Sequence, residues 1–284
     1  MPKSFDYSPA SCGAIFMIIS LSPLYFCANI IHMTTNYGTN LKLIFSQPQN
    51  TVITVKWLTA NGLTHSQILR LEKSGIIKRL SSGAYARFND TPDIFGALYT
   101  LQKQLNMTSH IGGRTALSIV YGKTQYIANR NVELFCNKQE KLPTWFKTLF
   151  ANSFNQFMTE FLPASEGISE WDHNGYKSFV STQERALLEM LYQVPTTVTP
   201  QEAFEILQLI TALKPAVLQK LLEVCKSVKT KRLLCCLAEL CGHQWFSRLN
   251  LETIDLGSGI REITKGGKLN TKYNLVLPEG LETL

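Results

Sequence analysis

The sequence predicts an α+β protein with an N-terminal winged helix-turn-helix, a mixed α/β middle region, and a mainly helical C-terminal region that ends in a β element. The first observation is that residues 52–88 follow the order helix, turn, helix and β-hairpin. The second is that strand-like and helix-like stretches alternate between residues 91 and 178. The third is that apolar residues recur at helical spacing through the last third of the chain.

Four segments follow from these patterns. They are an apolar extension over residues 1–32, the winged helix-turn-helix over 33–90, an α+β middle region over 91–178, and a mainly helical C-terminal domain over 179–284. Pro23 and Asn29 interrupt the apolar stretch of the extension, so it is marginal as a membrane span. We expect an upstream extension or a mis-assigned start ahead of Met33, with a weak membrane segment as the alternative.

Composition and charge describe an ordinary globular protein with anionic partners. Hydrophobic residues make up 45% of the chain and charged residues 17%, which excludes a disordered chain. The net charge of +7 and the pI near 9.0 favour anionic partners. None of the seven cysteines has CxxC spacing, so we expect buried free thiols in a reducing cytoplasm, with no metal and no cofactor.

The first two helices of the winged helix-turn-helix are short. Residues Asn40–Ser46 are expected to form the first helix, and Thr54–Ala60 the second, with Thr54 as its N-cap. Asn61 and Gly62 both tolerate positive φ, which predicts a tight turn after the second helix.

The next helix and the hairpin complete this domain. Thr64 with Gln67 three residues later is a capping box, and Gly75 is placed to end the helix in a left-handed conformation. Residues Ile76–Leu80 and Ala84–Phe88 then read as two strands around a serine- and glycine-containing turn. This order of elements predicts a recognition helix followed by a wing.

Basic and hydrogen-bonding side chains concentrate on these two elements. Residues 52–88 contain six lysines and arginines against one acid, Glu72. We expect Gln67 and Arg70 to contact base edges, and Lys73, Lys78 and Arg79 to contact the DNA backbone. A module for protein contacts, or an ordinary solvated basic face, is the alternative. The predicted DNA-binding residues here are Thr64, His65, Ser66, Gln67, Arg70, Lys73, Lys78, Arg79 and Ser82.

The middle region is expected to alternate helices and strands. Thr91 as N-cap and Pro92 at the first helical position predict a helix after the wing. The segment HIGGRTAL, residues 110–117, is expected to enter a short helix that ends at Gly122. Strands are expected over Gln125–Asn137 and Ser153–Phe161, with a helical segment from residue 143 between them.

The C-terminal region carries strong helix-start signals. Ser181 with Glu184 and Thr199 with Glu202 both have capping-box spacing ahead of apolar helical patterns. A glycine- and lysine-rich segment follows these helices, and a final strand is expected over Tyr273–Leu277.

The chain resembles the AbiEi antitoxins of abortive-infection (AbiE) type IV toxin–antitoxin systems from about Met33 to its C-terminus. The resemblance rests on SGAYARF, DIFGALYTLQKQL and HIGGRTAL in the N-terminal half, and on STQERALLEML, LLEVCKSVKTKRLLCCLAELCGHQWFSRLN and IDLGSGIREITKGGKLNTKYNLVLPEGL in the C-terminal half. It implies a winged-helix autorepressor that binds double-stranded DNA at repeats in its own promoter. It also implies a nucleotidyltransferase-like toxin as functional partner, counteracted without a stable complex, and a role in phage defence.

Lysines and arginines after residue 225 form a second basic region. Glycines between residues 257 and 267 allow close backbone approach, which a phosphate-contacting turn uses. We hypothesise that Arg261, Lys265 and Lys268 add phosphate contacts, with a solvated face around a structural hairpin as the alternative. The basic residues are Lys226, Lys229, Lys231, Arg232, Arg248, Arg261, Lys265, Lys268 and Lys272.

Two further hypotheses stay open at this point. One is a winged-helix regulator without a toxin. The other is an enzyme that carries a winged helix, for which the polar residues Glu166, Glu170, Asp172 and His173 are the candidates. Their spacing matches no known ligand set, and we expect them in a glycine-containing, solvated loop. The sequence therefore favours a protein that is not an enzyme and has no small-molecule substrate.

Overall fold

The structure is a computed structural model that describes residues 37–122 and 131–281. Its contacts divide the chain into two compact units, Met1–Ser46 and Gln47–Leu284. In the first unit, residues 37–46 form a helix in which Ile44 is buried, which confirms the helix predicted there. The apolar extension predicted over residues 1–32 lies outside the described residues. Within the described ranges, no helix is both long and apolar enough to cross a membrane.

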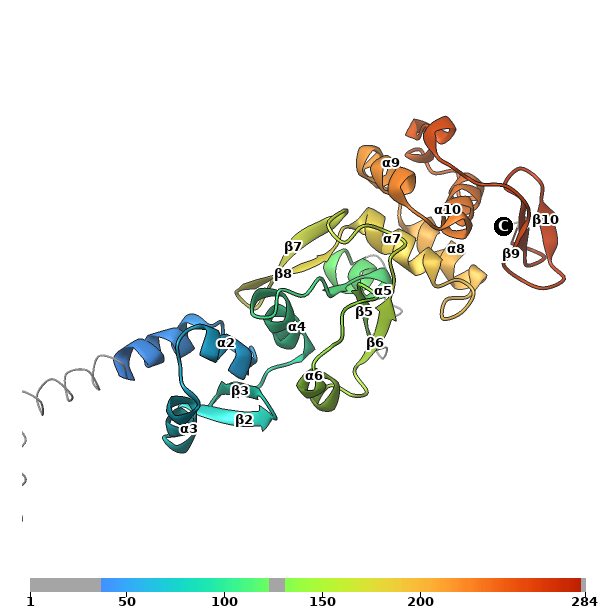
Figure 1. Cartoon of the computed structure of the whole chain (residues 1–284). Coiled ribbons are helices and arrows are strands. Elements are labelled where there is room, and N and C mark those ends of the chain that lie inside the picture. The colour runs from blue at the N-terminus through green and yellow to red at the C-terminus, as the bar shows by residue number, and fades with distance from the viewer. Residues whose placement is uncertain (1–36, 123–130, 282–284) are drawn as a thin grey trace, which may run out of the picture. The chain divides into compact units, whose positions relative to one another are not determined.

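The predicted helix-turn-helix is present in the second unit (Figure 1). Helix α2 (Val55–Ala60) begins after Thr54, whose hydroxyl accepts a hydrogen bond from the Trp57 N–H. Helix α3 (His65–Lys73) begins with the predicted capping box. Thr64 Oγ1 accepts from the Gln67 N–H, and Gln67 Oε1 accepts from the Thr64 N–H at 2.8 Å. Local chemistry therefore fixes both helix starts.

The wing is the antiparallel hairpin of β2 (Ile77–Ser81) and β3 (Ala84–Arg87). The short strand β1 (Ile53–Thr54) pairs with β3, so the three strands form a sheet in the order β1-β3-β2. Gly83 has a φ of 77°, a conformation that the tight turn between the strands requires and that glycine adopts without strain. The hairpin confirms the winged form of the helix-turn-helix.

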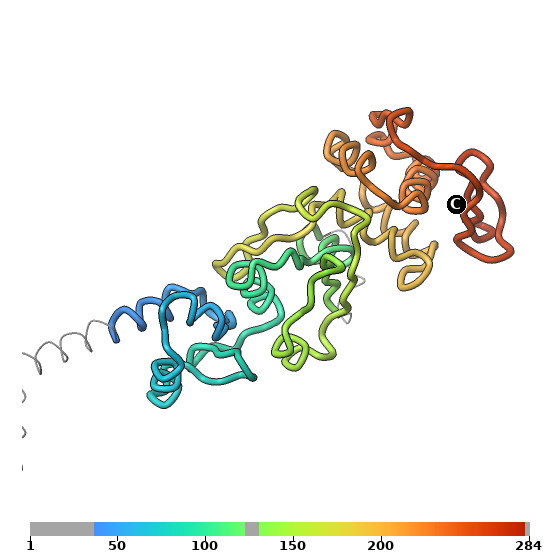
Figure 2. Tube along the Cα trace, viewed as in Figure 1, coloured from blue at the N-terminus to red at the C-terminus, as the bar shows by residue number. Residues whose placement is uncertain are grey.

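Helix α4 (Ile94–Lys103) follows the wing along the chain (Figure 2). Its start differs from the prediction. The N-cap is Asp93, whose carboxylate accepts a hydrogen bond from the Gly96 N–H at 2.8 Å. Thr91 is held two residues earlier, because its N–H donates to the side chain of Asn50. The Thr91 N-cap prediction was therefore wrong, since this tertiary contact fixes the chain before the helix.

A five-stranded sheet lies after α4, in the order β6-β5-β4-β8-β7. Strand β5 pairs antiparallel with β4 and parallel with β6, and β8 pairs parallel with β4 and antiparallel with β7. The strands are β4 (His110–Ile111), β5 (Val132–Cys136), β6 (Phe154–Met158), β7 (Ile168–His173) and β8 (Tyr176–Ser181). Helix α6 (Thr144–Leu149) starts after Pro143 between β5 and β6, as predicted.

Three parts of this region differ from the sequence prediction. The HIGGRTAL segment starts as the strand β4 before it turns into a short helix, α5 (Gly113–Thr115), and a π-helical turn, Ala116–Val120. The strand predicted over Gln125–Asn137 is observed as β5 over Val132–Cys136, and residues 125–130 of that prediction lie outside the described residues. The residues expected in a loop around 166–175 form most of the β7–β8 hairpin.

Four helices dominate the C-terminal region, as predicted. They are α7 (Gln183–Tyr192), α8 (Pro200–Leu209), α9 (Pro215–Val224) and α10 (Val228–Leu240). The capping box predicted at Ser181 was wrong by one residue, because Thr182 caps α7 and accepts from the Arg185 N–H. Thr199 caps α8 as predicted, with its hydroxyl accepting from the Glu202 N–H.

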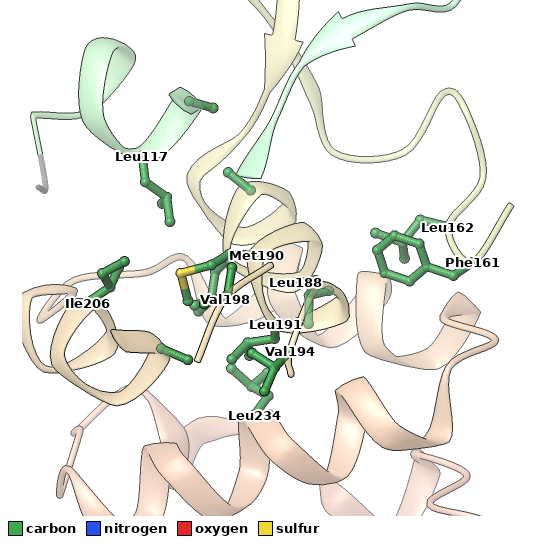
Figure 3. Close-up of a cluster of buried hydrophobic side chains, with 14 of the residues drawn as sticks. Leu117, Phe161, Leu162, Leu188, Met190, Leu191, Val194, Val198, Ile206 and Leu234 are labelled. Atoms are coloured by element: carbon green, nitrogen blue, oxygen red, sulfur yellow. The ribbon is translucent and has the colours of Figure 1, made fainter. Parts of the chain in front are cut away.

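Apolar side chains of these helices form a common core (Figure 3). Leu191 of α7, Ile206 of α8 and Leu234 of α10 are fully buried within it. Cys136, Cys225, Cys235 and Cys236 are also buried as free thiols, as predicted. The chain ends in a small sheet in the order β10-β11-β9, built from β9 (Arg261–Glu262), β10 (Lys268–Asn270) and β11 (Leu275–Leu277).

Candidate nucleic-acid interface

The outward face of α3 carries two rows of side chains. His65, Leu69 and Lys73 follow one another at four-residue spacing, and Ser66 and Arg70 form the neighbouring row. All five are exposed, whereas the opposite face of the helix buries its apolar residues in the domain core. The helix therefore presents a hydroxyl, an imidazole, two cationic groups and one apolar side chain to a partner.

Leu69 is a residue of this face that sequence reasoning missed. The residue is 46% exposed and lies between His65 and Lys73 on the helix surface. The sequence did indicate this position, because Leu69 does not belong to the apolar stripe formed by Ile68 and Leu71 and must therefore point away from the core.

Gln67, which was predicted to contact a base edge, takes part in the capping box of α3. Its Oε1 atom accepts hydrogen bonds from the Thr64 N–H and from Thr64 Oγ1 at 2.8 and 3.0 Å. Base reading by Gln67 would therefore use the Nε2 group of its amide. Arg70 projects from the exposed part of the helix, with its side chain open to solvent.

The wing is joined to the recognition helix by side chains. Arg79 of β2 donates from Nε to Glu72 Oε1 at 3.0 Å and from Nη2 to Glu72 Oε2 at 2.9 Å. The Tyr85 hydroxyl of β3 donates to the same carboxylate at 3.3 Å, and the guanidinium lies 5.0 Å from the Tyr85 ring centre. The hydrogen bond from Arg79 holds the pKa of Glu72 below its ordinary value, and burial raises the pKa of Tyr85.

The other predicted wing residues occupy different positions. Lys78 lies on the opposite face of β2 from Ile77 and Arg79, because successive residues of a strand alternate between faces. Ser82 is exposed at the tip of the hairpin. Arg87 pairs with Asp90 at 2.8 Å, which reduces the positive charge that the wing can offer. The contacts of all these residues with DNA stay predictions.

The second basic region is smaller than the sequence indicated. Arg261 of β9, Lys265 and Lys268 of β10 are exposed in the C-terminal sheet. Lys231 and Arg232 of α10 are buried, so the prediction that they belong to a basic surface was wrong. Lys229 is partly buried and donates to the carbonyl oxygens of Tyr192 and Val194, while Lys272 pairs with Glu239.

The hydrogen bonds of Arg232 account for the glycines of the LGSG motif at residues 256–259. Its guanidinium donates to the carbonyl oxygens of Leu256, Gly257 and Gly259, at 2.7, 2.9 and 2.5 Å. Gly257 and Gly259 both have positive φ, which lets the backbone turn its carbonyls toward the guanidinium. The buried arginine thus replaces regular backbone pairing in this loop and positions the sheet that carries Arg261.

The two glycines of HIGGRTAL lie against buried carboxylates. A Cβ atom on Gly112 would lie 2.0 Å from Glu189 Oε2, and one on Gly113 would lie 2.3 Å from Glu133 Oε2. His110 Nε2 lies 3.0 Å from Glu189 Oε1, and the Gly113 N–H donates to Glu189 Oε2 at 3.1 Å. The motif is therefore part of a buried polar network that joins β4 to α7.

Arg114 extends this network to α8. Its guanidinium donates to Glu133 Oε1 through Nε and Nη2, and to Glu202 Oε1 through Nη1 at 3.1 Å. Its backbone N–H also donates to Glu133 Oε2 at 2.8 Å. Removing one partner of a buried ion pair of this kind typically costs about 3–5 kcal/mol, because the other charge is left buried without compensation.

The residues considered for an enzyme site do not converge. Trp171 and His173 of β7 stack with ring centres 4.7 Å apart, whereas Glu170 and Asp172 alternate with them and are exposed. Glu170 pairs with Lys177, and Glu166 pairs with Lys220. Among residues 37–122 and 131–281, no group of three metal-ligating side chains is placed to hold an ion.

The helix-turn-helix, the exposed basic face of α3 and the attached wing define a winged-helix protein of the transcription-regulator class. The chain belongs to the AbiEi antitoxin family of transcriptional regulators. Residues 39–129 match the family described as "Transcriptional regulator, AbiEi antitoxin N-terminal domain", and residues 129–278 match "Transcriptional regulator, AbiEi antitoxin, Type IV TA system".

Comparison with solved structures supports the same fold. The RV2827C protein from Mycobacterium tuberculosis superposes with a TM-score of 0.57 over 84% of this chain and 89% of that chain, at 13% identity. At this identity the likeness concerns the fold alone. No curated protein sequence matches the chain significantly.

Proposed function

We propose that this chain is a DNA-binding autorepressor that reads repeats in its own promoter through α3. The observation that carries the proposal is the exposed face of α3, where Ser66, Arg70 and Lys73 project from a helix held by a capping box and by the wing. Such a helix fits the major groove, with arginine suited to guanine edges and lysine to phosphates. Membership of a family of transcriptional regulators supports this assignment.

The wing and the C-terminal sheet have supporting roles in this proposal. Thr64, His65, Gln67, Lys78, Arg79 and Ser82 contribute hydrogen bonds or backbone contacts around the recognition helix. Arg261, Lys265 and Lys268 contact phosphates outside the site that α3 reads, because they are exposed cations in the C-terminal sheet.

We further infer that the protein counteracts a nucleotidyltransferase-like toxin in the cytoplasm without a stable complex between the two proteins. The support is the family, which is described as an antitoxin of a type IV system. A winged-helix regulator without a toxin partner is the second candidate. An enzyme has less support, since the polar side chains of β7 lie on both faces of the strand.

Repression and neutralisation are separable by experiment. A reporter driven by the chain's own promoter tests repression, with Arg70→Ala expected to relieve it. Growth rescue tests neutralisation, with antitoxin and toxin each expressed from an unrelated promoter so that autorepression has no effect. Repression without growth rescue would favour the second candidate, a regulator that has no toxin partner. Co-purification of the two proteins in a fixed ratio would contradict the proposal that they form no stable complex.

A further inference from the structure

Two adjoining cavities open beside β4 in the second unit. The smaller has a volume of about 250 Å³ and the larger about 500 Å³. Thr108, His110 and Ala164 line both cavities, so the two lie side by side and are together called the recess. The smaller cavity lies at the carboxyl ends of the parallel strands β5 and β6, where Cys136 and Thr159 contribute to its wall. Ligands of open α/β sheets commonly bind at such strand ends.

Arg185 is a buried cation in the wall of the smaller cavity. Its side chain is 4% exposed, with Nε donating to Glu189 at 2.7 Å and Nη1 donating to the carbonyl oxygens of Pro163 and Glu166. Among the described residues, Nη2 has no hydrogen-bond partner within the protein. A buried guanidinium held in place by three other hydrogen bonds is thus preorganised to donate from its remaining nitrogen.

Lys226 adds a second cation at the rim. Its backbone N–H donates to the Phe161 carbonyl, which fixes the position of the residue. No partner for its ammonium group exists within residues 37–122 and 131–281. Lys226 also lines a neighbouring recess of about 360 Å³ together with Lys138 and Glu160. Glu160 also lines both recesses, and Arg185 is paired with Glu189, so Lys226 is the cation of the smaller cavity without an ion pair among the described residues.

The larger cavity has a different character. Met107, Ile168 and Phe179 provide apolar surface there, while Gln102 donates to the Ser109 and Phe179 carbonyl oxygens. Glu170 also lines this cavity, and its carboxylate is paired with Lys177. The recess therefore offers cationic donors in one part and apolar side chains in the other. A ligand that fills both parts carries an anionic group at one end and an apolar group at the other.

We propose that this recess binds a small organic phosphate, with its phosphoryl group at Arg185 and Lys226 and its apolar group against Met107, Ile168 and Phe179. A guanidinium from α7 and an ammonium from the segment before α10 approach the smaller cavity from different elements. Thr108 and Thr159 also line the smaller cavity. A phosphoryl group offers three acceptor oxygens against the two of a carboxylate, so it suits donors that come from several elements.

The test is a calorimetric titration of the full chain at constant ionic strength with phenyl phosphate and, separately, with inorganic phosphate. We expect phenyl phosphate to bind at least severalfold more tightly, because only it reaches the apolar part of the recess. Lys226→Ala is expected to weaken phenyl phosphate binding roughly tenfold or more, as for loss of a charge-assisted hydrogen bond. Lys147→Ala, which changes an exposed lysine of α6 outside the recess, is the matched control and is expected to bind as the wild type does.

Three results would overturn the proposal. The first is the absence of binding of either phosphate at millimolar concentration. The second is equal loss of affinity in Lys226→Ala and Lys147→Ala, which would reduce the effect to overall charge. The third is equal affinity for inorganic and phenyl phosphate, which would show that the apolar part of the recess takes no share in binding. DNA binding enters none of these measurements, so their outcome is independent of the function proposed above.

Discussion

Arg79 of the wing and Glu72 of the recognition helix form a two-point ion pair, with donor–acceptor distances of 3.0 and 2.9 Å. Tyr85, directly across the hairpin from Arg79, donates its hydroxyl to the same carboxylate. Three side chains from three elements thus meet at one carboxyl group. The wing is held against α3 by this group as well as by the core, which fixes the orientation of the wing relative to the helix.

Glu72→Gln should remove most of this link and lower the thermal stability of the protein. The pKa of Glu72 lies below its ordinary value of 4.5, so the contribution is fully present above about that pH. It is lost as the pH falls through the lowered pKa, because the carboxylate becomes protonated in the folded state. The difference in melting temperature between wild type and Glu72→Gln should therefore shrink on acidification.

The control for this measurement is Glu252→Gln, which changes an exposed glutamate of the C-terminal region. It should leave the melting temperature close to that of the wild type at every pH. A difference for Glu72→Gln that persists unchanged to low pH would contradict the assignment of the effect to the ion pair.

Leu69 should contact thymine methyl groups if α3 lies in the major groove. Each such contact contributes about 0.8 kcal/mol, so replacing thymine by uracil throughout the bound fragment should weaken wild-type binding roughly fourfold per contact. Leu69→Ala should bind the two fragments equally well. A mobility shift with promoter fragments synthesised with either nucleotide measures both effects.

This experiment distinguishes the role of Leu69 from DNA binding itself. Specific binding by the wild type with equal affinity for both fragments would remove Leu69 from the reading face while leaving α3 as the recognition helix. Random DNA synthesised with the same two nucleotides is the control for any general effect of uracil.

Neutralising Arg261, Lys265 and Lys268 together should make DNA binding less dependent on salt. Each phosphate contact that is lost makes the slope of log K against log salt concentration less steep by about 0.9, so three contacts change it by roughly 2.7. A triple change to glutamine keeps a polar side chain and removes the charge. A slope equal to that of the wild type would assign these residues to a solvated face.

Glu189 is expected to be necessary for the fold. Burial alone would raise the pKa of its carboxyl group, but His110 and Arg185 outweigh this effect and bring the pKa to about 2. Glu189→Gln leaves the buried Arg185 without its counter-charge, which typically costs about 3–5 kcal/mol. Denaturant unfolding at neutral pH measures the loss, and a change below about 1 kcal/mol would contradict a structural role for the network.

The winged helix could be predicted from the sequence because its signals are local. The Thr64–Gln67 capping box and the glycine at 75 act within a few residues of chain, and the structure shows both. Asp93 replaced Thr91 as the N-cap of α4 because a contact with Asn50, about forty residues earlier, holds Thr91 in place. A local pattern carries no information on such a contact.

The burial of Arg232 could not be predicted from the sequence, because its partners are also distant along the chain. Arg232 was expected on a basic surface, yet it lies within the protein and donates to carbonyl oxygens of residues more than twenty positions later in the chain.

The residues of β7 were expected in a loop, but they form the β7–β8 hairpin. Asn174 and Gly175 at its turn both have positive φ. An Asn-Gly pair between two stretches of β-forming residues is a hairpin signal that the sequence did contain.

The measurement that tests the central claim most directly is a mobility-shift titration of the full chain on the DNA upstream of its own gene. Wild type, Arg70→Ala and Lys73→Ala are compared on that fragment and on random DNA at several salt concentrations. We expect specific binding that Arg70→Ala weakens by about 1–3 kcal/mol, with relaxed sequence preference, while Lys73→Ala weakens binding to both DNAs alike. Equal affinity of the wild type for the two DNAs would contradict the account and assign the winged helix to contacts with another protein.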